Sequence, residues 1–375
     1  MTPIQMVDLR TQYEKIKTQI DNAVLGVLQS SAFINGPDVA KFTEEMKNYL
    51  KVKHVIPCGN GTDAIKIALM SLGLKPGDEV ITPSFTYVAT AESICLLGYK
   101  PVFVEVDEHT FTLSSQAFEK AITPKTKALI AVHLYGLCAH LEPIMEIAKK
   151  NNITVIEDTA QALGTDYIFN NGRKQKAGTI GHIGTSSFFP SKNLGCYGDG
   201  GMICTNDLTL AKRLKMTSNH GQSQKYVHDL IGVNSRLDTM QAAILRIKLA
   251  HLDNYISARN KVAEYYDTAF KNNDALIIPF RPAYSSHGFH QYTLTVKSRR
   301  DELVKYLSDK KIPTVVYYPI PLHLQKAYQQ YGYKKGDFPA TEKLCDTILS
   351  LPMHTELDEE QLKYIVEVVA QYLRL

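Results

Sequence analysis

Short apolar runs rich in β-branched residues alternate with longer helix-like segments up to about residue 205. The runs predict buried strands at 79–84, 101–107, 128–136 and 153–158, and the end of another strand at 55–60. Patterns with one apolar face predict helices, among them 63–74 and 141–152. This alternation is typical of an α/β domain with a mainly parallel sheet.

The pattern changes after residue 235. A long helical pattern covers 236–270, and a shorter unit follows it, with TLTVK at 293–297, IPTVVYYPIPL at 312–322 and a final helix at 358–375. We therefore expect a large domain over residues 1–248 and a smaller C-terminal α+β domain over residues 249–375. The boundary then falls inside the long helix.

Composition excludes several classes of protein. The chain has 375 residues, of which 44% are hydrophobic and 21% charged, so it can bury a large core and is not disordered. Its net charge of +4 is scattered without long runs, which argues against binding nucleic acid or lipid surfaces. The most apolar window, 128–148, is interrupted by histidines, a glycine and a proline, so we expect no membrane insertion.

The six cysteines lack CxxC spacing, and the first residues do not resemble a secretion signal, so a reduced, cytoplasmic protein is expected. The twelve histidines form no HExxH or finger-like motif, and we expect no metal site.

Lys192 is the one basic residue of the segment GTSSFFPSKNLGCYGDGG at 184–201. Phe188, Phe189 and Pro190 precede it, and apolar surroundings lower the pKa of a lysine, so that part of its population is neutral and can form a Schiff base. The alternative is an ordinary lysine with a buried stem and a solvated head.

Asp158 ends the predicted strand ITVIED at 153–158. A carboxylate at this point could keep the pyridine nitrogen of pyridoxal phosphate protonated. It could instead cap a helix starting in TAQALG at 159–164.

The turn GNGT at 59–62 leads into the helix predicted at 63–74. Amides of the helix start, the Thr62 hydroxyl and Ser187 could hold a phosphate, although a plain strand-to-helix turn has the same sequence features. Tyr87 could stack on an aromatic cofactor or pack in the core, and Gln161 could donate to a ring oxygen or face solvent. Together with Lys192, these residues meet the requirements of one cofactor, pyridoxal 5′-phosphate.

Five motifs, GNGTDAI, GDEVITPSFTYVATAESI, VIEDTAQALG, SFFPSKNLGCYGDGG and GVNSRLDTMQAAIL, resemble those of the sugar-nucleotide aminotransferases of the DegT/DnrJ/EryC1/StrS family. The resemblance extends from about residue 5 to LSLPMH at 349–354. It implies pyridoxal-phosphate fold type I, the aspartate aminotransferase-like fold, with a mainly parallel mixed sheet. It also implies a homodimer with active sites at the subunit interface.

By motif position, the resemblance implies that Lys192 forms the Schiff base with pyridoxal 5′-phosphate, with pyridoxamine 5′-phosphate as the aminated intermediate. Asp158 would pair with the pyridine nitrogen and Gln161 would meet the ring oxygen. The other cofactor contacts would be the stacking residue Tyr87, the phosphate-binding residues Gly61, Thr62 and Ser187, and Asn234 from the partner subunit. Members with histidine in place of this lysine perform dehydration, so Lys192 favours transamination.

Among subgroups, SFFPSK-x-LGCYGDGG, GVNSRLDT-x-QAAIL and YPIPL are most similar to enzymes that aminate C3 of UDP-2-acetamido-2-deoxy-3-oxo-D-glucuronate. These enzymes use L-glutamate and serve surface polysaccharides such as the O-antigen of lipopolysaccharide. Arg236 would bind the sugar carboxylate, because a bidentate guanidinium suits that anion; its alternative role is a helix-start arginine paired with Asp238 or solvent.

Tyr317 and Tyr318 would contact the substrate, but this subgroup tends to have His-Tyr before PIPL. With tyrosine instead of histidine at position 317, a possible cation beside the sugar carboxylate is missing. The rival assignment is therefore a TDP-3-keto-6-deoxyhexose 3-aminotransferase, whose substrate has no carboxylate.

Two other classes of protein are alternatives: a non-catalytic regulator that retains the cofactor pocket, and a nucleotide-binding protein with a phosphate loop. Retention of Lys192, Asp158 and Gln161 argues against the first, and the absence of GxxxxGK[ST] and GxGxxG argues against the second.

Overall fold

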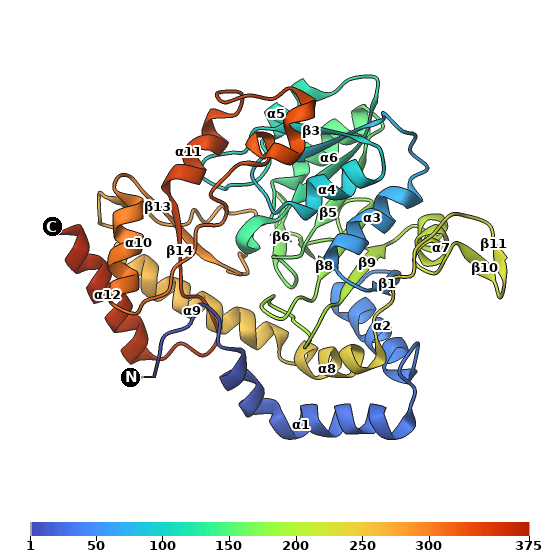
Figure 1. Ribbon diagram of the computed structural model, residues 1–375, viewed down its shortest axis with the longest axis horizontal. Helices are drawn as coiled ribbons and strands as arrows, with labels where there is room; N and C mark the ends of the chain where they lie inside the picture. Colours follow the sequence, from blue (N-terminus) through green and yellow to red (C-terminus); the bar gives the residue numbers. More distant parts are fainter. Residues whose placement is uncertain (1, 375) are drawn as a thin grey trace.

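A seven-stranded sheet forms the centre of the computed structural model, which describes residues 2–374 (Figure 1). Its strand order is β1-β9-β8-β5-β4-β2-β3. The strands are β1 (His54–Cys58), β2 (Glu79–Pro83), β3 (Lys100–Val104), β4 (Thr126–Val132), β5 (Thr154–Asp158), β8 (Ile183–Ser187) and β9 (Gly201–Thr205).

The sheet is parallel from β8 through β5, β4 and β2 to β3, while β9 pairs antiparallel with both β8 and β1. Most residues of these strands are buried, which agrees with their near-continuous apolar sequences. The predictions of an α/β fold and of a mainly parallel mixed sheet are confirmed. The carboxyl ends of four neighbouring strands, β8, β5, β4 and β2, therefore meet at one edge.

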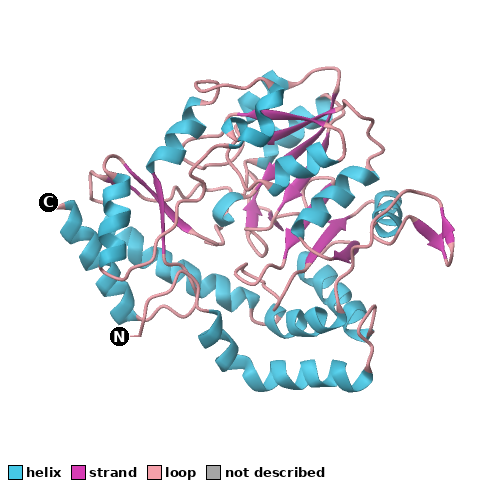
Figure 2. Cartoon of the chain, viewed as in Figure 1, coloured by secondary structure: helices cyan, strands magenta, loops and turns pink. Residues whose placement is uncertain are grey.

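Helices cover both faces of the sheet (Figure 2). One face shares a core with α3, α4 and α7, and the other with α5 and α6. A further layer of α1, α2 and α8 lies beside the β1 and β9 end of the sheet. These helices are α1 (Leu9–Ser30), α2 (Pro37–Leu50), α3 (Gly61–Ser71), α4 (Ala89–Leu96), α5 (Ser115–Ala121), α6 (Leu141–Lys150), α7 (Leu208–Thr217) and α8 (Thr239–Leu249).

A second apolar core lies between a small antiparallel sheet and the C-terminal helices. Its elements are β12 (Leu276–Ile277), β13 (Tyr292–Val296), β14 (Ile348–Leu351), α9 (Leu252–Phe270), α10 (Arg300–Asp309) and α12 (Glu359–Leu373). Helix α12 begins at a capping box: the Asp358 side chain accepts a hydrogen bond from the Gln361 backbone amide, and the Gln361 side chain accepts one from the Asp358 backbone amide. Ile4, near the N-terminus, also belongs to this core. A domain boundary at residue 248 stays a prediction.

The long helical pattern at 236–270 forms two helices, α8 and α9, separated at residues 250–251. Ala242 and Leu245 of α8 pack in a core with α2, whereas Val262 and Tyr266 of α9 pack in the second core. One straight helix would not serve both cores, so tertiary packing divides the pattern.

Residues 312–322, IPTVVYYPIPL, form no regular strand and contribute one isolated bridge, Val315 with Ser350. The remaining short elements are β6 (Asp166–Ile168), β7 (Lys174–Lys176), β10 (Gln222–Gln224), β11 (Val227–His228) and α11 (Pro339–Thr347), with 3₁₀ turns at Leu134–Gly136, Leu322–Leu324 and Lys326–Tyr331. The hairpin of β10 and β11 projects from the body of the molecule (Figure 2). Tyr226 in this hairpin is 81% exposed, and nearby Ile231 is 89% exposed. Among residues 2–374, no helix is both long and apolar enough to cross a membrane.

Candidate active site

A cavity of about 650 Å³ lies at the carboxyl ends of the central strands. Val132, Asp158 and Ser187 line it, and each is the last residue of its strand. Open α/β sheets bind ligands at this position. The cavity brings together all the predicted site residues except Asn234 and Arg236, namely Gly61, Thr62, Tyr87, Asp158, Gln161, Ser187, Lys192, Tyr317 and Tyr318.

Lys192 lies on the loop between β8 and β9. Its backbone N–H donates to the carbonyl of Phe189 at 2.8 Å, and fully buried Phe188 packs edge-on against Phe42, which anchors the loop. Surrounding protein atoms lower the pKa of the Lys192 amine to about 8, against the opposing effect of the Asp158 charge. A substantial neutral fraction is therefore present near pH 8, as a nucleophilic lysine requires.

Asp158 faces the same cavity and is 8% exposed. Burial raises its pKa, although the Ala160 N–H, which donates to the carboxylate at 3.0 Å, and the Lys192 charge act in the opposite direction. Residues 159–164 form turns and no helix starts there, so the helix-cap alternative is wrong. A buried carboxylate of this kind favours a cationic partner inside the cavity.

A histidine and a second carboxylate, whose pairing the sequence patterns did not reveal, lie behind Asp158. His133 and Glu157 are both fully buried, and His133 Nε2 lies 2.9 Å from Glu157 Oε2. His133 Nδ1 accepts from the Ala139 amide, so Nε2 carries a hydrogen and donates it to Glu157. The His133 amide also donates to the Asp158 carbonyl, which ties β4 to the end of β5.

The start of α3 forms one wall of the cavity. Asn60 caps the helix by accepting from the Asp63 amide at 2.7 Å, and the Gly61 and Thr62 amides make no hydrogen bond to residues 2–374. A Cβ at Gly61 would lie 2.6 Å from the Ser187 Cβ, so only glycine allows these two segments to approach. Free amides beside the Thr62 and Ser187 hydroxyls suit a phosphate.

Gln161 is held in a defined orientation. Its Oε1 accepts from the Tyr135 amide at 2.7 Å, so its Nε2 must point the other way, where it donates to the Tyr318 hydroxyl at 3.2 Å. The Tyr135 hydroxyl also donates to the Tyr317 carbonyl. Tyr87, 56% exposed, lies on the same side with its ring centroid 6.0 Å from that of Tyr318.

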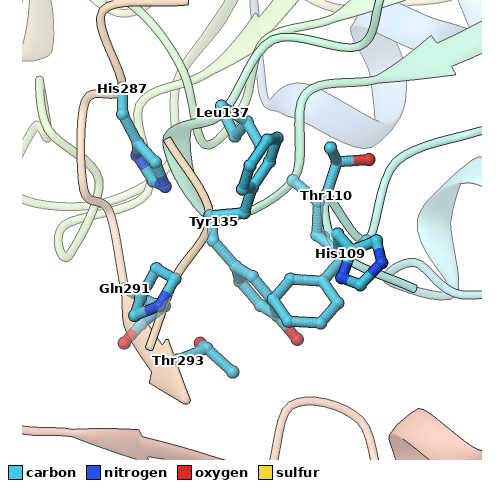
Figure 3. A pocket seen from close by; sticks show the side chains of 11 residues that line it. His109, Thr110, Tyr135, Leu137, His287, Gln291 and Thr293 are labelled. Carbon is cyan, nitrogen blue, oxygen red and sulfur yellow. The ribbon is translucent and has the colours of Figure 1, made fainter. Parts of the chain in front are cut away.

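Tyr135 separates this cavity from a much smaller one of about 10 Å³, which Figure 3 shows with His287 and Gln291 beside Tyr135. A space of that size holds at most one water molecule. The larger cavity is therefore the candidate site for a cofactor and substrate.

Asn234 and Arg236 do not line the cavity of this chain. Between them, buried Ser235 donates to Asp63 at 2.7 Å and accepts from the Gly59 amide at 2.9 Å. This fixes the segment against the start of α3, while Asn234 is exposed and Arg236 is half-buried. Arg236 forms no ion pair with Asp238 or any other residue in the described part of the chain.

The cavity also contains polar residues that sequence reasoning missed. Asp63 and Lys66 form an ion pair of 2.6 Å at the α3 start. Tyr135, His290 and Gln291 also line the cavity. The sequence offered no signal for His290 and Gln291, because they lie far along the chain from every motif around Lys192.

A family model for the DegT/DnrJ/EryC1/StrS aminotransferase family matches residues 14–370. The chain belongs to this family. It is 48% identical to a pleiotropic regulatory protein of Geobacillus stearothermophilus, over 99% of both chains. It is 44% identical to the UDP-2-acetamido-2-deoxy-3-oxo-D-glucuronate aminotransferase of Pseudomonas aeruginosa, over 96% of this chain and 98% of the relative. It is 39% identical to a dTDP-3-amino-3,4,6-trideoxy-alpha-D-glucose transaminase of Streptomyces venezuelae, over 98% and 96%.

Solved structures agree with this assignment. The fold matches that of Streptomyces venezuelae DesV in complex with a ketimine intermediate, with a TM-score of 0.95 and 38% identity over the whole of both chains. NtdA of Bacillus subtilis with bound cofactor PMP matches with a TM-score of 0.89 and 31% identity, over 99% of this chain and 83% of that one. The protein therefore has the aminotransferase fold type I, and it is a sugar aminotransferase enzyme.

Aminotransferases work with pyridoxal 5′-phosphate, and the cavity fits this cofactor. It offers a lysine of lowered pKa, a buried carboxylate that forms no ion pair with residues 2–374, and free amides beside two hydroxyls. These are the groups needed for the aldehyde, the ring nitrogen and the phosphate, respectively.

Proposed function

We propose that this enzyme transfers the amino group of L-glutamate to C3 of UDP-2-acetamido-2-deoxy-3-oxo-D-glucuronate, in the biosynthesis of a surface polysaccharide such as the O-antigen of lipopolysaccharide. The observation that carries the reaction is the joint placement of Lys192, Asp158 and the α3 start in one cavity. Identity of 44% to an aminotransferase named for this sugar supports the substrate. We also propose a cytoplasmic enzyme, which six free cysteines support.

The roles of the residues follow from their positions. The cofactor, when bound, withdraws electrons from the donor carbon. Asp158 would hold the ring nitrogen protonated, and Thr62, Ser187 and the Gly61 amide would hold the phosphate. Lys192 Nζ would take the proton from Cα of glutamate as a general base and deliver it, as a general acid, to the cofactor carbon C4′. In the second half of the reaction, Lys192 would move the proton in reverse toward the sugar carbon.

We propose a homodimer in which Asn234 and Arg236 serve the partner's cavity, Asn234 at the cofactor and Arg236 at the sugar carboxylate. Their placement outside this chain's own cavity on a segment anchored by Ser235, and the exposed apolar residues Tyr226 and Ile231 nearby, support this arrangement. Mixing Lys192→Ala protein with Arg236→Ala protein tests it, because mixed dimers regain one complete site. If activity does not rise after subunit exchange, the sites are not shared.

A second candidate is a TDP-3-keto-6-deoxyhexose 3-aminotransferase. No arginine among residues 2–374 of the same chain lines the cavity, Lys66 is already paired with Asp63, and Tyr317 carries no charge, so a sugar without a carboxylate would also suit. The similarity to a dTDP-sugar transaminase supports this candidate. The name of the Geobacillus relative suggests a non-catalytic regulator, but membership of an aminotransferase family and the presence of Lys192 in the cavity argue against it.

The deciding experiment is visible absorption of the cofactor-loaded protein. It is titrated with L-glutamate and, separately, with UDP-2-acetamido-3-amino-2,3-dideoxyglucuronate, which drives the second half-reaction backward. Conversion of the cofactor by both compounds supports the proposal. Conversion by glutamate alone favours the deoxyhexose candidate, and conversion by neither compound overturns the proposed amino donor and the proposed sugar.

A further inference from the structure

His290 and Gln291 are consecutive residues that line the large cavity and take no part in the roles described so far. They are 5% and 6% exposed. The side chain of neither residue has a hydrogen-bond partner among residues 2–374, and His290 Nδ1 is fully buried. His290 Nδ1 is thus a fully buried polar atom without a partner in the described chain, and the neighbouring Gln291 side chain lines the cavity without one.

Such an arrangement is costly unless a ligand completes it. A buried polar group without a partner loses its hydrogen bonds to water and gains none in return. Native proteins contain few such groups, and they concentrate where function requires them. A ligand group that accepts hydrogen bonds from both side chains would remove the cost.

The charges around His290 are positive. Burial, Lys192 and Arg259 together keep its pKa well below the usual value, so the ring is neutral and has one N–H to donate. Arg259 is 4% exposed and has no carboxylate partner in the described chain. Its NH1 group donates to the carbonyls of Phe289, His290 and Met353, and its Nε has no partner among residues 2–374. An anion arriving beside His290 would compensate this buried charge.

The backbone fixes this segment relative to Lys192. Asn193, the residue after Lys192, donates from Nδ2 to the Gly288 carbonyl at 3.0 Å. The Gly288 amide in turn donates to the Gly136 carbonyl at 2.7 Å. His290 is therefore held at the Lys192 end of the cavity, and a group that it binds belongs to the molecule reacting there.

We propose that His290 and Gln291 form a carboxylate-binding subsite, and that it takes the α-carboxylate of the amino-group donor. Donor N–H groups in positive surroundings select an anion over a hydroxyl, and a carboxylate can accept from both side chains at once. This inference rests on the proposed function, since that function brings an amino acid to Lys192. The other source of a carboxylate at this site is a uronate sugar, and the experiment separates the two.

The test compares His290→Ala and His290→Asn with a matched control, His287→Asn. His287 is also buried, but its Nδ1 is already bonded to the Phe289 amide and it lies outside the large cavity. Calorimetry measures the affinity of cofactor-loaded protein for glutarate, which cannot react. His290→Ala should weaken binding roughly ten- to a hundred-fold, His290→Asn less, and His287→Asn not measurably. Equal unfolding midpoints show that each variant folds.

Half-reactions then identify the source of the carboxylate. The concentration of L-glutamate for half-maximal rate should rise in His290→Ala by a similar factor, with little change in the saturating rate. UDP-2-acetamido-3-amino-2,3-dideoxyglucuronate and its glucose counterpart, which lacks the carboxylate, should be affected alike and weakly. If only the glucuronate compound is weakened, the subsite takes the sugar carboxylate.

Loss of affinity that is the same for every ligand, or no loss for any ligand, overturns the subsite. Failure of the proposed function is distinct, because it appears in the unmutated enzyme. If the unmutated protein does not react with L-glutamate at all, the function is wrong. If it reacts and the His290 variants match it, only the subsite is wrong.

Discussion

Glu157 points to one side of the central sheet at the end of β5, and Asp158, the next residue, points to the other side, into the cavity. On the first side the carboxylate is saturated, because His133 and the amides of Gly178, Ile180 and Gly181 all donate to it. Burial alone would raise the pKa of Glu157, but His133 and these amides lower it.

On the cavity side Asp158 accepts from one amide, and burial raises its pKa. The difference teaches how to distinguish a structural carboxylate from a functional one in the same strand. The first has its full set of donors within the fold. The second lacks a full set of donors, so its buried charge is stabilised only when a cation binds beside it.

The largest effect should come from removing the lysine that lines the same cavity as Asp158. Lys192→Ala removes both the nucleophile and the acid-base group, so turnover should fall at least about a thousand-fold. The bound cofactor should also lose its covalent link, which absorption after borohydride treatment measures. The exposed Lys174→Ala variant is the control, and a fully active Lys192→Ala enzyme would refute the assignment of the site.

Asp158→Asn should damage catalysis without damaging the fold. An amide does not hold the ring nitrogen protonated, so kcat should fall roughly a hundred-fold or more. The cofactor-free protein should be as stable as before or more stable, because a buried charge has been removed. Steady-state kinetics and urea unfolding measure the two quantities, and a large loss of stability would contradict the contrast with Glu157.

Glu157→Gln should give the opposite result, with stability as the main loss. One of the carboxylate oxygens becomes an NH₂ group facing backbone donors, so the free energy of unfolding should fall by about 3 kcal/mol. Urea unfolding of the cofactor-free variant checks this against Asp158→Asn. Equal stability of the two variants would show that the two sides of the strand do not differ.

The pH dependence should separate the two carboxylates with a smaller effect. The folded pKa of Glu157 lies below its usual 4.5, so its contribution to stability is present above pH 4.5 and is lost as pH falls through the folded value. The folded pKa of Asp158 lies above its usual 3.8, so its contribution is present below pH 3.8 and declines as pH rises through the folded value.

Unfolding midpoints of the cofactor-free protein between about pH 3 and pH 7 measure both contributions. Glu157→Gln should flatten the acid side of the profile, and Asp158→Asn should remove the decline toward neutral pH. Identical profiles for both variants would contradict the assigned directions.

The local sequence determined much of this protein. Short apolar runs predicted β1 to β5, and helical patterns predicted α3, α6 and α12. Ordered motifs predicted Lys192, Asp158 and the Gly61–Thr62 helix start, which share one cavity in the structure. These features depend on residues that are close together in the chain, so they can be recognised from the sequence. The roles of Asn234 and Arg236 stay predictions, because their proposed targets lie on another subunit.

Tertiary structure alone decided the rest. The helical pattern at 236–270 gave no sign of its division into α8 and α9, which follows from packing against two separate cores. The His133–Glu157 pair and the unpartnered His290 beside Lys192 join strands and loops distant in sequence. Burial and hydrogen bonding set the charge of such groups, and neither exists until the chain has packed.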